Sequence, residues 1–483
     1  MRVIIIYDDT GHKSEVISDI IGDKGFSDVV VKKRKLEEYY KEAVCQAFPD
    51  LVWKKIHSSF EYSDLAKELE VYYSDDVKIV HCFSNYLISD VSKALLSFRK
   101  IAYVDLQYAI LSEKRAVAGV FPSVREYTSF LRLVLSGQKP WDLIRNSKHS
   151  FEIEGMVDIG IVSNFIQCIT GNFDSRYFNT LKGNEYTLVK SSTNKEKIRA
   201  EYTFFHLLPD DMKYWFVMPF NYCETGDSAS YTMERLHMTD LAIKWVHGSM
   251  DESEFEELLD KYFFFFNSRH WKACSQDEYV RISDDLYEHK VKDRITKLKE
   301  HKEYKKFERL LADTDFDVNC LLNRYLSLKQ NIEERTDYPL RLVIGHGDPC
   351  FANALYNKST KTLKFIDPKG ALIESDLWTN PYYDVAKLSH SVCGRYDFFN
   401  NGLFDIKINS EFLYELEIPF NNRIYINIFK KKLEENGFDY MTVRIYEASL
   451  FLSMLPLHID NPHKVFGFIL NVKNILDEVE DDV

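Results

Sequence analysis

The stretch that decides the fold is His346–Asn353, which reads HGDPCFAN, and Asp367 follows fourteen residues after it. The apolar run Leu342–Ile344 leads into this stretch, and a second run, Leu363–Ile366, leads into Asp367. Such runs are typical of buried strands, so the pattern predicts a strand, a polar loop and a hairpin that ends at a carboxylate. The competing interpretation is a plain turn, because His, Asp and Asn favour turns anyway.

Three polar residues of this region have the order that phosphoryl transfer needs. In that reaction one carboxylate orients the attacking hydroxyl, while an amide and a second carboxylate hold Mg²⁺ on the nucleotide phosphates. We therefore predict that Asp348 is catalytic and that Asn353 and Asp367 bind the metal. The protein-kinase catalytic loop has the same skeleton, His-x-Asp followed by four residues and Asn. His346 is expected to brace the loop through hydrogen bonds.

The details of the motif resemble aminoglycoside phosphotransferases and choline kinases, which are small-molecule kinases. These enzymes typically carry His-Gly-Asp, as at His346–Asp348, and an Asp-x-Ala pattern farther on, which Asp384–Ala386 fits. The residues Pro368–Gly370 depart from those that usually follow the metal Asp. The resemblance implies ATP and Mg²⁺ as cofactors and a hydroxyl of a small molecule as the phosphate acceptor.

The segment before this motif has the element order of a kinase N-lobe, which we place at residues 166–237. A hairpin, a helix and two further strands precede a long stretch that is mainly helical, from about 238 to 335, and the C-lobe is expected to span 238–483. The predicted N-lobe elements are the strands Ser175–Leu181 and Tyr186–Ser191, the helix Lys195–Leu208, and the strands Trp215–Pro219 and Tyr231–Glu234.

A kinase needs a lysine on a strand of this lobe to contact the nucleotide phosphates, and a glutamate on the next helix to orient it. Lys190 ends an apolar strand, and Glu201 lies eleven residues on, within the following helix. We predict this pair for those roles. Lys195 and Lys197 are competing candidates for the lysine, and the alternative is a surface Lys with a solvated helix Glu.

The stretch Tyr231–Leu236 resembles the hinge whose backbone groups hydrogen-bond adenine. Met233, Glu234 and Leu236 are therefore predicted to bind the nucleotide, although an ordinary strand end would read the same way. No Gly-x-Gly-x-x-Gly motif precedes this lobe. The polar stretch Gly171–Arg176 is expected to cover the phosphates in its place.

Residues 1–165 alternate between strands and helices, which favours a three-layer α/β domain. The predicted fold class is therefore an α/β N-terminal domain followed by an α+β, protein-kinase-like domain with a β-rich N-lobe and a helical C-lobe. The strands expected in the first domain are Val3–Tyr7, Val29–Val31, Val77–Cys82, Ile101–Val104 and one that ends at Gly119–Phe121, with helices near Ser89–Phe98 and Val124–Leu135.

This first domain resembles a shortened sugar nucleotidyltransferase at Met1–Ile6, Ala118–Ser123 and Val157–Gly160. Fusions of such a domain with a choline-kinase-like domain occur in bacterial capsule and surface-glycan biosynthesis. The resemblance implies an acceptor destined for a surface glycan, such as a sugar, polyol or amino alcohol, and a partner enzyme of that synthesis as a possible ligand of the N-terminal domain.

The first domain is nevertheless expected to be catalytically inactive. Asp8 and Asp9 stand where a glycine-rich loop should cradle a triphosphate, and acids there are electrostatically unfavourable for phosphates. Ser84 and Asn85 stand where a metal Asp is expected, so that Asp158 alone could hold only part of a metal site.

Composition narrows the function classes further. The chain has 483 residues and a net charge of −13, which argues against a nucleic-acid partner. Its eight cysteines include no Cys-x-x-Cys pair, as is typical of free thiols in a reducing cytosol, so a cytoplasmic location is expected. No apolar run approaches the length of a membrane span.

These observations together predict a cytoplasmic, ATP-dependent kinase that phosphorylates a hydroxyl of a small metabolite. Two alternatives stay open. One is a bifunctional enzyme whose N-terminal half still transfers a nucleotidyl group. The other is a pseudokinase scaffold that binds nucleotide without transferring phosphate, although a scaffold has no need of Asp348, Asn353 and Asp367 together.

Overall fold

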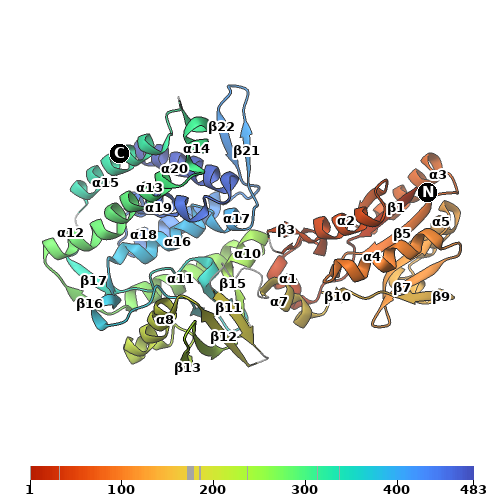
Figure 1. The fold of residues 1–483 in the computed structure, drawn as a ribbon, viewed down its shortest axis with the longest axis horizontal. Coiled ribbons are helices and arrows are strands. Elements are labelled where there is room, and N and C mark those ends of the chain that lie inside the picture. The colour runs from red at the N-terminus through yellow and green to blue at the C-terminus, as the bar shows by residue number, and fades with distance from the viewer. Residues whose placement is uncertain are drawn as a thin grey trace. The chain divides into compact units, whose positions relative to one another are not determined.

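The computed structural model describes residues 2–31, 33–170, 179–183, 186–236, 238–312, 314–336 and 338–482 (Figure 1). The chain divides into two compact units, residues 1–171 and 172–483.

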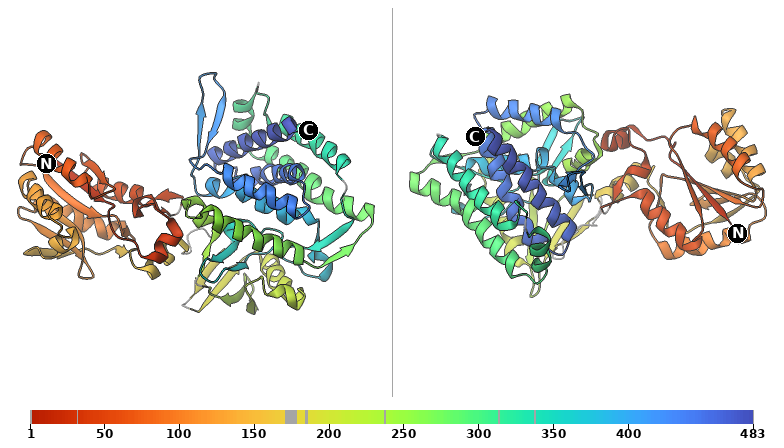
Figure 2. Two further views of the ribbon diagram at one scale, coloured as in Figure 1. Left: turned by 180° about the vertical axis from the view of Figure 1, so that it is seen from behind. Right: turned by 90° about the horizontal axis from the view of Figure 1, so that it is seen from above.

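A six-stranded sheet with the order β4-β1-β5-β8-β7-β9 forms the centre of the first unit. β1 runs parallel to both β4 and β5, and all of its residues are buried, as expected of a strand covered on both faces. Helix α3 lies against α5 and α2 against α4, and helices cover both faces of the sheet (Figure 2). The elements are β1 (Val3–Asp8), β4 (Val52–Ile56), β5 (Lys78–Phe83), β7 (Tyr108–Ser112), β8 (Arg115–Phe121), β9 (His149–Glu152), α2 (Leu36–Ala47), α3 (Glu61–Tyr72), α4 (Val91–Lys100) and α5 (Val124–Leu135).

One strand predicted for this unit is wrong. The run Ile101–Val104 contains a 3₁₀ turn, Ile101–Tyr103, which directly continues α4. Ile101 is fully buried, so the apolar character of the run reflects core packing. A short apolar run does not by itself distinguish a strand from a buried helical turn.

The second unit begins with a four-stranded antiparallel sheet with the order β11-β12-β14-β13. Helix α8 packs on this sheet, and Figure 1 shows both on one side of the unit. Residues 175–178 of the predicted first strand lie outside the described residues, and Asn179–Leu181 belongs to β11. The elements are β11 (Asn179–Gly183), β12 (Thr187–Ser192), α8 (Lys195–Leu207), β13 (Pro219–Glu224) and β14 (Ala229–Glu234).

A second predicted strand lies elsewhere than expected. We predicted Trp215–Pro219, whereas β13 begins at Pro219 and ends at Glu224. Trp215 and Phe216 are buried, and both lie against the backbone of Phe365. Pro219 can begin β13 because this strand lies at the edge of the sheet, where a missing N–H interrupts no ladder.

The rest of the second unit is a helical lobe around α16 (Pro381–Val392), which is buried along nearly its whole length. The predicted hairpin is confirmed, since β17 (Arg341–Ile344) leads into the polar loop and β18 (Ala354–Asn357) pairs with β19 (Thr362–Phe365). In the part of the chain that the structure describes, no helix is long and apolar enough to cross a membrane. The principal helices are α10 (Leu241–His247), α11 (Glu252–Ser268), α12 (Gln276–Asp284), α13 (Lys290–Glu300), α14 (Tyr304–Leu311), α15 (Val318–Arg335), α17 (Tyr396–Asn400), α18 (Arg423–Glu435), α19 (Tyr440–Met454) and α20 (Pro462–Asp482).

A π-helical turn, Asp285–His289, connects α12 to α13. Such turns add one residue to a helix and are frequent at functional sites. Lys290 is the first residue after this turn, so the turn sets the direction in which Lys290 points.

Candidate active site

Lys190 on β12 and Glu201 on α8 form a buried ion pair, with 2.7 Å between Nζ and Oε2. Both residues are at most 3% exposed. Glu201 Oε2 also accepts a hydrogen bond from the hydroxyl of Tyr231 at 3.0 Å, which fixes the carboxylate toward the lysine. Lys197, a competing candidate, reaches the other oxygen of Glu201 only at 3.6 Å and is half exposed. Lys190 is therefore the lysine that the fold orients.

Lys190 also contacts Asp367, with 2.8 Å between Nζ and Oδ1. Burial lowers the pKa of Lys190, but the charges of Asp367 and Glu201 outweigh burial and raise it above its ordinary value. The backbone of Asp367 has a φ of +57°, in a region that residues other than glycine rarely occupy and that is frequent at functional sites. The ammonium group of Lys190 thus links the N-lobe to Asp367, just after the hairpin.

The segment after Asp367 is held against both lobes. Lys369 N donates to His346 O at 2.9 Å, and Ala371 N donates to Ala200 O of α8 at 3.0 Å. Gly347 has a φ of +85°, and a Cβ there would lie 2.5 Å from Cβ of Lys369. This close approach explains why glycine stands between the His and the Asp of the loop.

The loop His346–Asn353 is anchored by one buried carboxylate on α16. Asp384 accepts hydrogen bonds from the backbone amides of His346 at 2.9 Å and Gly347 at 2.8 Å. Arg269, at the end of α11, donates to the same carboxylate at 3.0 Å and to the carbonyl of Pro381 at 3.2 Å. The Asp-x-Ala pattern in the sequence therefore serves to hold the backbone of the loop.

His346 braces the loop from inside, as predicted. Its Nδ1 accepts from the amide of Asp348 at 3.0 Å, and its Nε2 lies 2.9 Å from the carbonyl oxygen of Ile366. This pair of contacts requires a neutral ring with its proton on Nε2. Burial lowers the pKa of His346, in agreement with that form. The ring also stacks on Phe216 at 5.7 Å.

Asp348 is half-buried and faces Lys387 on α16, with 2.9 Å between Oδ1 and Nζ. Burial raises the pKa of Asp348, but Lys387 outweighs burial and holds it below its ordinary value. The carboxylate is therefore unprotonated at neutral pH and can accept a proton. Sequence analysis did not predict Lys387, although it lies three residues after Asp384 and hence on a neighbouring face of the same helix.

Asn353 lies at the end of the loop and donates from Nδ2 to the carbonyl of Asp348 at 2.9 Å. This contact engages the amide nitrogen of Asn353. Ile366 N donates to Asn353 O at 3.0 Å, so the backbone just before Asp367 is hydrogen-bonded to Asn353. The structure thus brings Asp348, Asn353 and Asp367 to one hairpin.

Met233 and Glu234 end β14, which pairs with β12, the strand that carries Lys190. Met233 is buried and lines a small recess with Phe216 and Ile366, a recess that Glu201 and Asp367 also line. Glu234 is exposed and Leu236 is half-buried. The predicted phosphate-covering stretch Gly171–Arg176 lies outside the described residues.

In the N-terminal unit, the acids that a metal site would need already have partners. Asp8 lies 2.9 Å from Nε2 of His81, and both side chains are buried. Asp9 accepts from the amide of Ser27 at 3.1 Å and from the hydroxyl of Ser84 at 2.6 Å. These contacts stabilise the buried acids within the domain.

Asp158 is also fully engaged. Its Oδ1 accepts from Asn85 Nδ2 and from Gly160 N, both at 2.9 Å, and its Oδ2 accepts from Arg115 at 2.7 Å. A carboxylate that is neutralised by an arginine is poorly arranged to hold a divalent cation.

Another group of possible metal ligands, not predicted from the sequence, is Asp9, Asp28 and His57, whose ligand atoms lie within 4.8 Å of one another. Lys35 Nζ lies 2.8 Å from Asp28, which is therefore already neutralised. We therefore assign no metal ion to this group.

The lysine–glutamate pair, the anchored loop and the terminal carboxylate of the second unit fit a kinase-like fold. No protein-family model and no curated protein matches the sequence. Among solved structures, a thermostable mutant of aminoglycoside phosphotransferase APH(4)-Ia is similar at 12% identity, over 66% of this chain and 99% of that chain, with a TM-score of 0.37.

Two other phosphotransferase structures are similar over 66% of this chain. The streptomycin-ATP-APH(2")-IIa ternary complex is 14% identical over 96% of its length, with a TM-score of 0.35. ADP-bound aminoglycoside phosphotransferase APH(2'')-Ib is 14% identical over 97% of its length, with a TM-score of 0.33.

Proposed function

We propose that this chain is an ATP-dependent phosphotransferase that transfers the γ-phosphoryl group of ATP to a hydroxyl of a small metabolite. The observation that carries the proposal is the double contact of Lys190, at 2.7 Å from Glu201 and 2.8 Å from Asp367. In kinases, a lysine and a glutamate placed in this way orient the phosphates, and the aspartate faces the metal.

In the proposed reaction the acceptor oxygen bonds to the γ-phosphorus while its proton passes to Asp348. The bond from the γ-phosphorus to the bridging oxygen breaks, and ADP leaves with the electron pair. Asp348 suits this role because Lys387 keeps its carboxylate unprotonated at neutral pH and fixes it in place.

Asn353 and Asp367 are the residues that would hold Mg²⁺, since amide and carboxylate oxygens are the ligands that this cation prefers. The bound cation would neutralise charge on the phosphates. We assign Lys190 to the phosphates, Glu201 to orienting Lys190, and Met233, Glu234 and Leu236 to the adenine side of the nucleotide.

A role in surface or capsular polysaccharide biosynthesis is proposed on the sequence resemblance, with a sugar, polyol or amino alcohol as the acceptor. The N-terminal unit is proposed to be non-catalytic, because Asp158 is neutralised by Arg115 and Asp8 and Asp9 lie among their own partners. These engaged acids argue against nucleotidyl transfer, and a pure scaffold has no need of Asp348, Asn353 and Asp367 together.

The test is a screen of sugars, polyols and amino alcohols for release of ADP from Mg-ATP by the full chain. In Asp348→Asn, the rate of ADP release with an active acceptor should fall by about 10²–10⁴-fold, as expected for removal of a general base. Mg-ATP should still raise the melting temperature of this variant. Near-normal turnover in folded Asp348→Asn would refute the mechanism.

A further inference from the structure

Tyr383 and Lys387 lie one turn apart on α16. Lys387 contacts Asp348, and Tyr383 lies on the side of Lys387 that is nearer the start of the helix. Tyr383 is 3% exposed, and its hydroxyl accepts a hydrogen bond from Lys290 Nζ at 2.9 Å. Burial raises the pKa of Tyr383, but Lys290, Lys387 and Lys369 together outweigh burial and lower it below its ordinary value. Lys290 thus contacts this buried hydroxyl directly, Lys387 contacts Asp348, and the backbone of Lys369 is hydrogen-bonded to His346 of the same loop.

The charge of this lysine cluster, which consists of Lys290, Lys369 and Lys387, is not balanced. Lys387 is paired with Asp348. Among the described residues, neither Lys290 nor Lys369 has a carboxylate oxygen within 4.0 Å, although the chain as a whole carries a net charge of −13. Lys290 is half-buried and Lys369 is exposed, so an anion that reaches the cluster meets two ammonium groups without carboxylate partners in the described part of the chain and is attracted by both.

The position of Lys290 is built into the helical lobe. The π-helical turn Asp285–His289 immediately precedes it, and Tyr287 of that turn packs on the ring of Tyr383 at 5.9 Å. Tyr287 also stacks on Tyr446 of α19, with 3.7 Å between ring centroids. The turn is therefore fixed from both sides, and Lys290 leaves it toward Tyr383.

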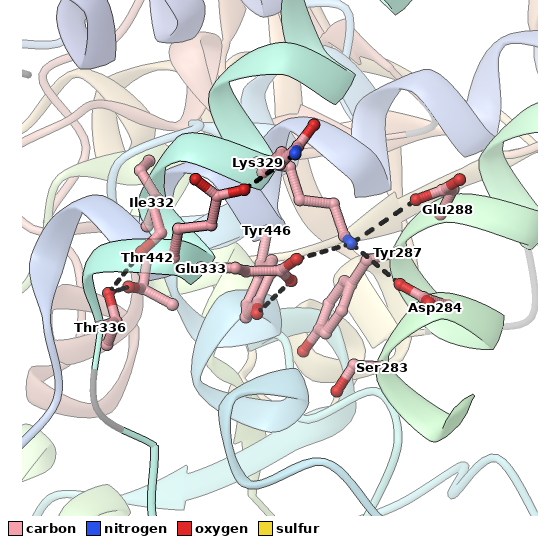
Figure 3. Close-up of polar contacts among 12 residues, drawn as sticks. Ser283, Asp284, Tyr287, Glu288, Lys329, Ile332, Glu333, Thr336, Thr442 and Tyr446 are labelled. Carbon is pink, nitrogen blue, oxygen red and sulfur yellow. Dashed lines mark hydrogen bonds and ion pairs between the residues drawn. The ribbon is translucent and has the colours of Figure 1, made fainter. Parts of the chain in front are cut away.

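A second, buried lysine ties the same turn to the bundle. Figure 3 shows Lys329 of α15 reaching between carboxylates from three elements. Its Nζ lies 3.0 Å from Asp284, 2.8 Å from Glu333 and 3.7 Å from Glu288, and Glu333 also accepts from Tyr446 at 2.8 Å (Figure 3). Lys329 is thus compensated by carboxylates, in contrast to Lys290, which directly follows the π-helical turn.

The lysine cluster has an open approach. Lys369 lines a groove of about 670 Å³ that runs between α8, the end of α12 and the segment 369–379. Of the acids on its wall, Asp285 pairs with Arg281, Asp376 accepts from the amide of Leu372, and Glu196 is exposed. Lys369 is the member of the cluster that lines this groove, and an acceptor of metabolite size can enter beside it.

We propose that this lysine cluster binds an anionic group of the acceptor, so that the substrate class is a hydroxyl compound that carries a phosphate or a carboxylate. The proposal rests on the kinase function proposed above and narrows its acceptor. It disfavours amino alcohols and amino sugars, because their cationic groups would face Lys290 and Lys369 at close range.

The test compares matched acceptors with the full chain and Mg-ATP, with ADP release and melting temperature as readouts. The compounds are glucose, glucose 6-phosphate, gluconate, glucosamine, ribitol and ribitol 5-phosphate, so that phosphate and carboxylate are separate arms. We expect anionic members to stimulate ADP release above their neutral partners. Lys290→Gln should raise the KM of the active anion by about tenfold to a hundredfold, as for loss of a charged hydrogen bond.

Two further variants separate charge from folding. Lys290→Arg should restore much of the affinity for the anion because it keeps the cation. Lys292→Gln is the matched control, since Lys292 lies on the same helix, is half exposed and pairs with Glu288 at 2.7 Å. Its KM should equal that of the parent.

Two outcomes would overturn the proposal. If glucose, ribitol or glucosamine is as good an acceptor as the anionic members, the chain is a kinase with a different acceptor class. If no anionic member stimulates ADP release or raises the melting temperature, the anion site is wrong. The kinase function is then judged separately by whether Mg-ATP stabilises the parent and not Asp367→Ala.

Discussion

Asp384 and Arg269 form an ion pair of 3.0 Å in which both side chains are buried, and the same carboxylate receives two amides of the catalytic loop. Removing one partner of a buried pair leaves the other charge uncompensated, which typically costs about 3–5 kcal/mol. We expect Asp384→Ala to lower the free energy of unfolding by that order and to abolish turnover. Urea unfolding and ADP release measure the two effects.

The exposed pair of Lys361 and Glu257 serves as its control. These side chains are more than 40% exposed and lie 2.8 Å apart. Exposed pairs contribute about 0–1 kcal/mol, so Lys361→Gln should leave the unfolding midpoint nearly unchanged. Equal losses in Asp384→Ala and Lys361→Gln would contradict the anchoring role of Asp384.

Lys387 should set the pH range of turnover. Asp348 must be unprotonated to accept a proton, and Lys387 holds its pKa below the ordinary value against the effect of burial. Lys387→Gln removes that cation, so the pKa of Asp348 should rise. Activity is lost as pH falls through this pKa, and the acid limb of kcat/KM should therefore move to higher pH. Lys387→Arg, which keeps the charge, should leave the limb near that of the parent.

Asp367 should be required for the effect of the metal. Its carboxylate faces Lys190, and oxygen ligands of this kind suit Mg²⁺. We expect ATP with Mg²⁺ to stabilise the parent more than ATP with EDTA, and Asp367→Ala to lose this difference. Thermal unfolding measures it. Asp210→Ala, at an exposed acid of the N-lobe, is the control, and a full Mg²⁺ effect in Asp367→Ala would refute the assignment.

Asp158 should be dispensable for phosphate transfer. Its carboxylate is bound by Arg115, Asn85 and the amide of Gly160, so its removal affects the N-terminal unit alone. We expect kinase turnover of Asp158→Ala within a few-fold of the parent, and no pyrophosphate from any nucleoside triphosphate with a sugar phosphate. A substrate-dependent pyrophosphate signal that Asp158→Ala abolishes would make the protein bifunctional.

The sequence predicted those parts of the site that lie close together along the chain. Asp348 and Asn353 lie in the loop before β18 and Asp367 lies just after β19, whereas Lys190 and Glu201 lie on one strand and the next helix, so their closeness could be expected from spacing. Strand ends were harder to predict, because Trp215 and Ile101 are apolar for reasons of core packing.

The contacts that the sequence did not predict join distant segments. Arg269 and Asp384 are 115 residues apart, and Lys290 and Tyr383 are 93 residues apart. No local pattern indicates that such residues meet, since the packing of helices on α16 decides it. Asp384 was recognised as part of a pattern, but its role as the acceptor of two loop amides required the folded backbone.

The π-helical turn Asp285–His289 restricts how this chain can change in length. Before the turn, Asp284 at the end of α12 contacts Lys329. After the turn, Lys290 contacts Tyr383. Deleting one residue of the turn would rotate everything after it by about 100° and carry Lys290 away from the active site. Surface loops tolerate insertions and deletions, whereas one residue added to or removed from this turn would change the direction in which every side chain of α13 points. With Lys290 binding the acceptor as proposed, a length change at this turn would alter the acceptor site and leave Asp348 and Asp367 in place.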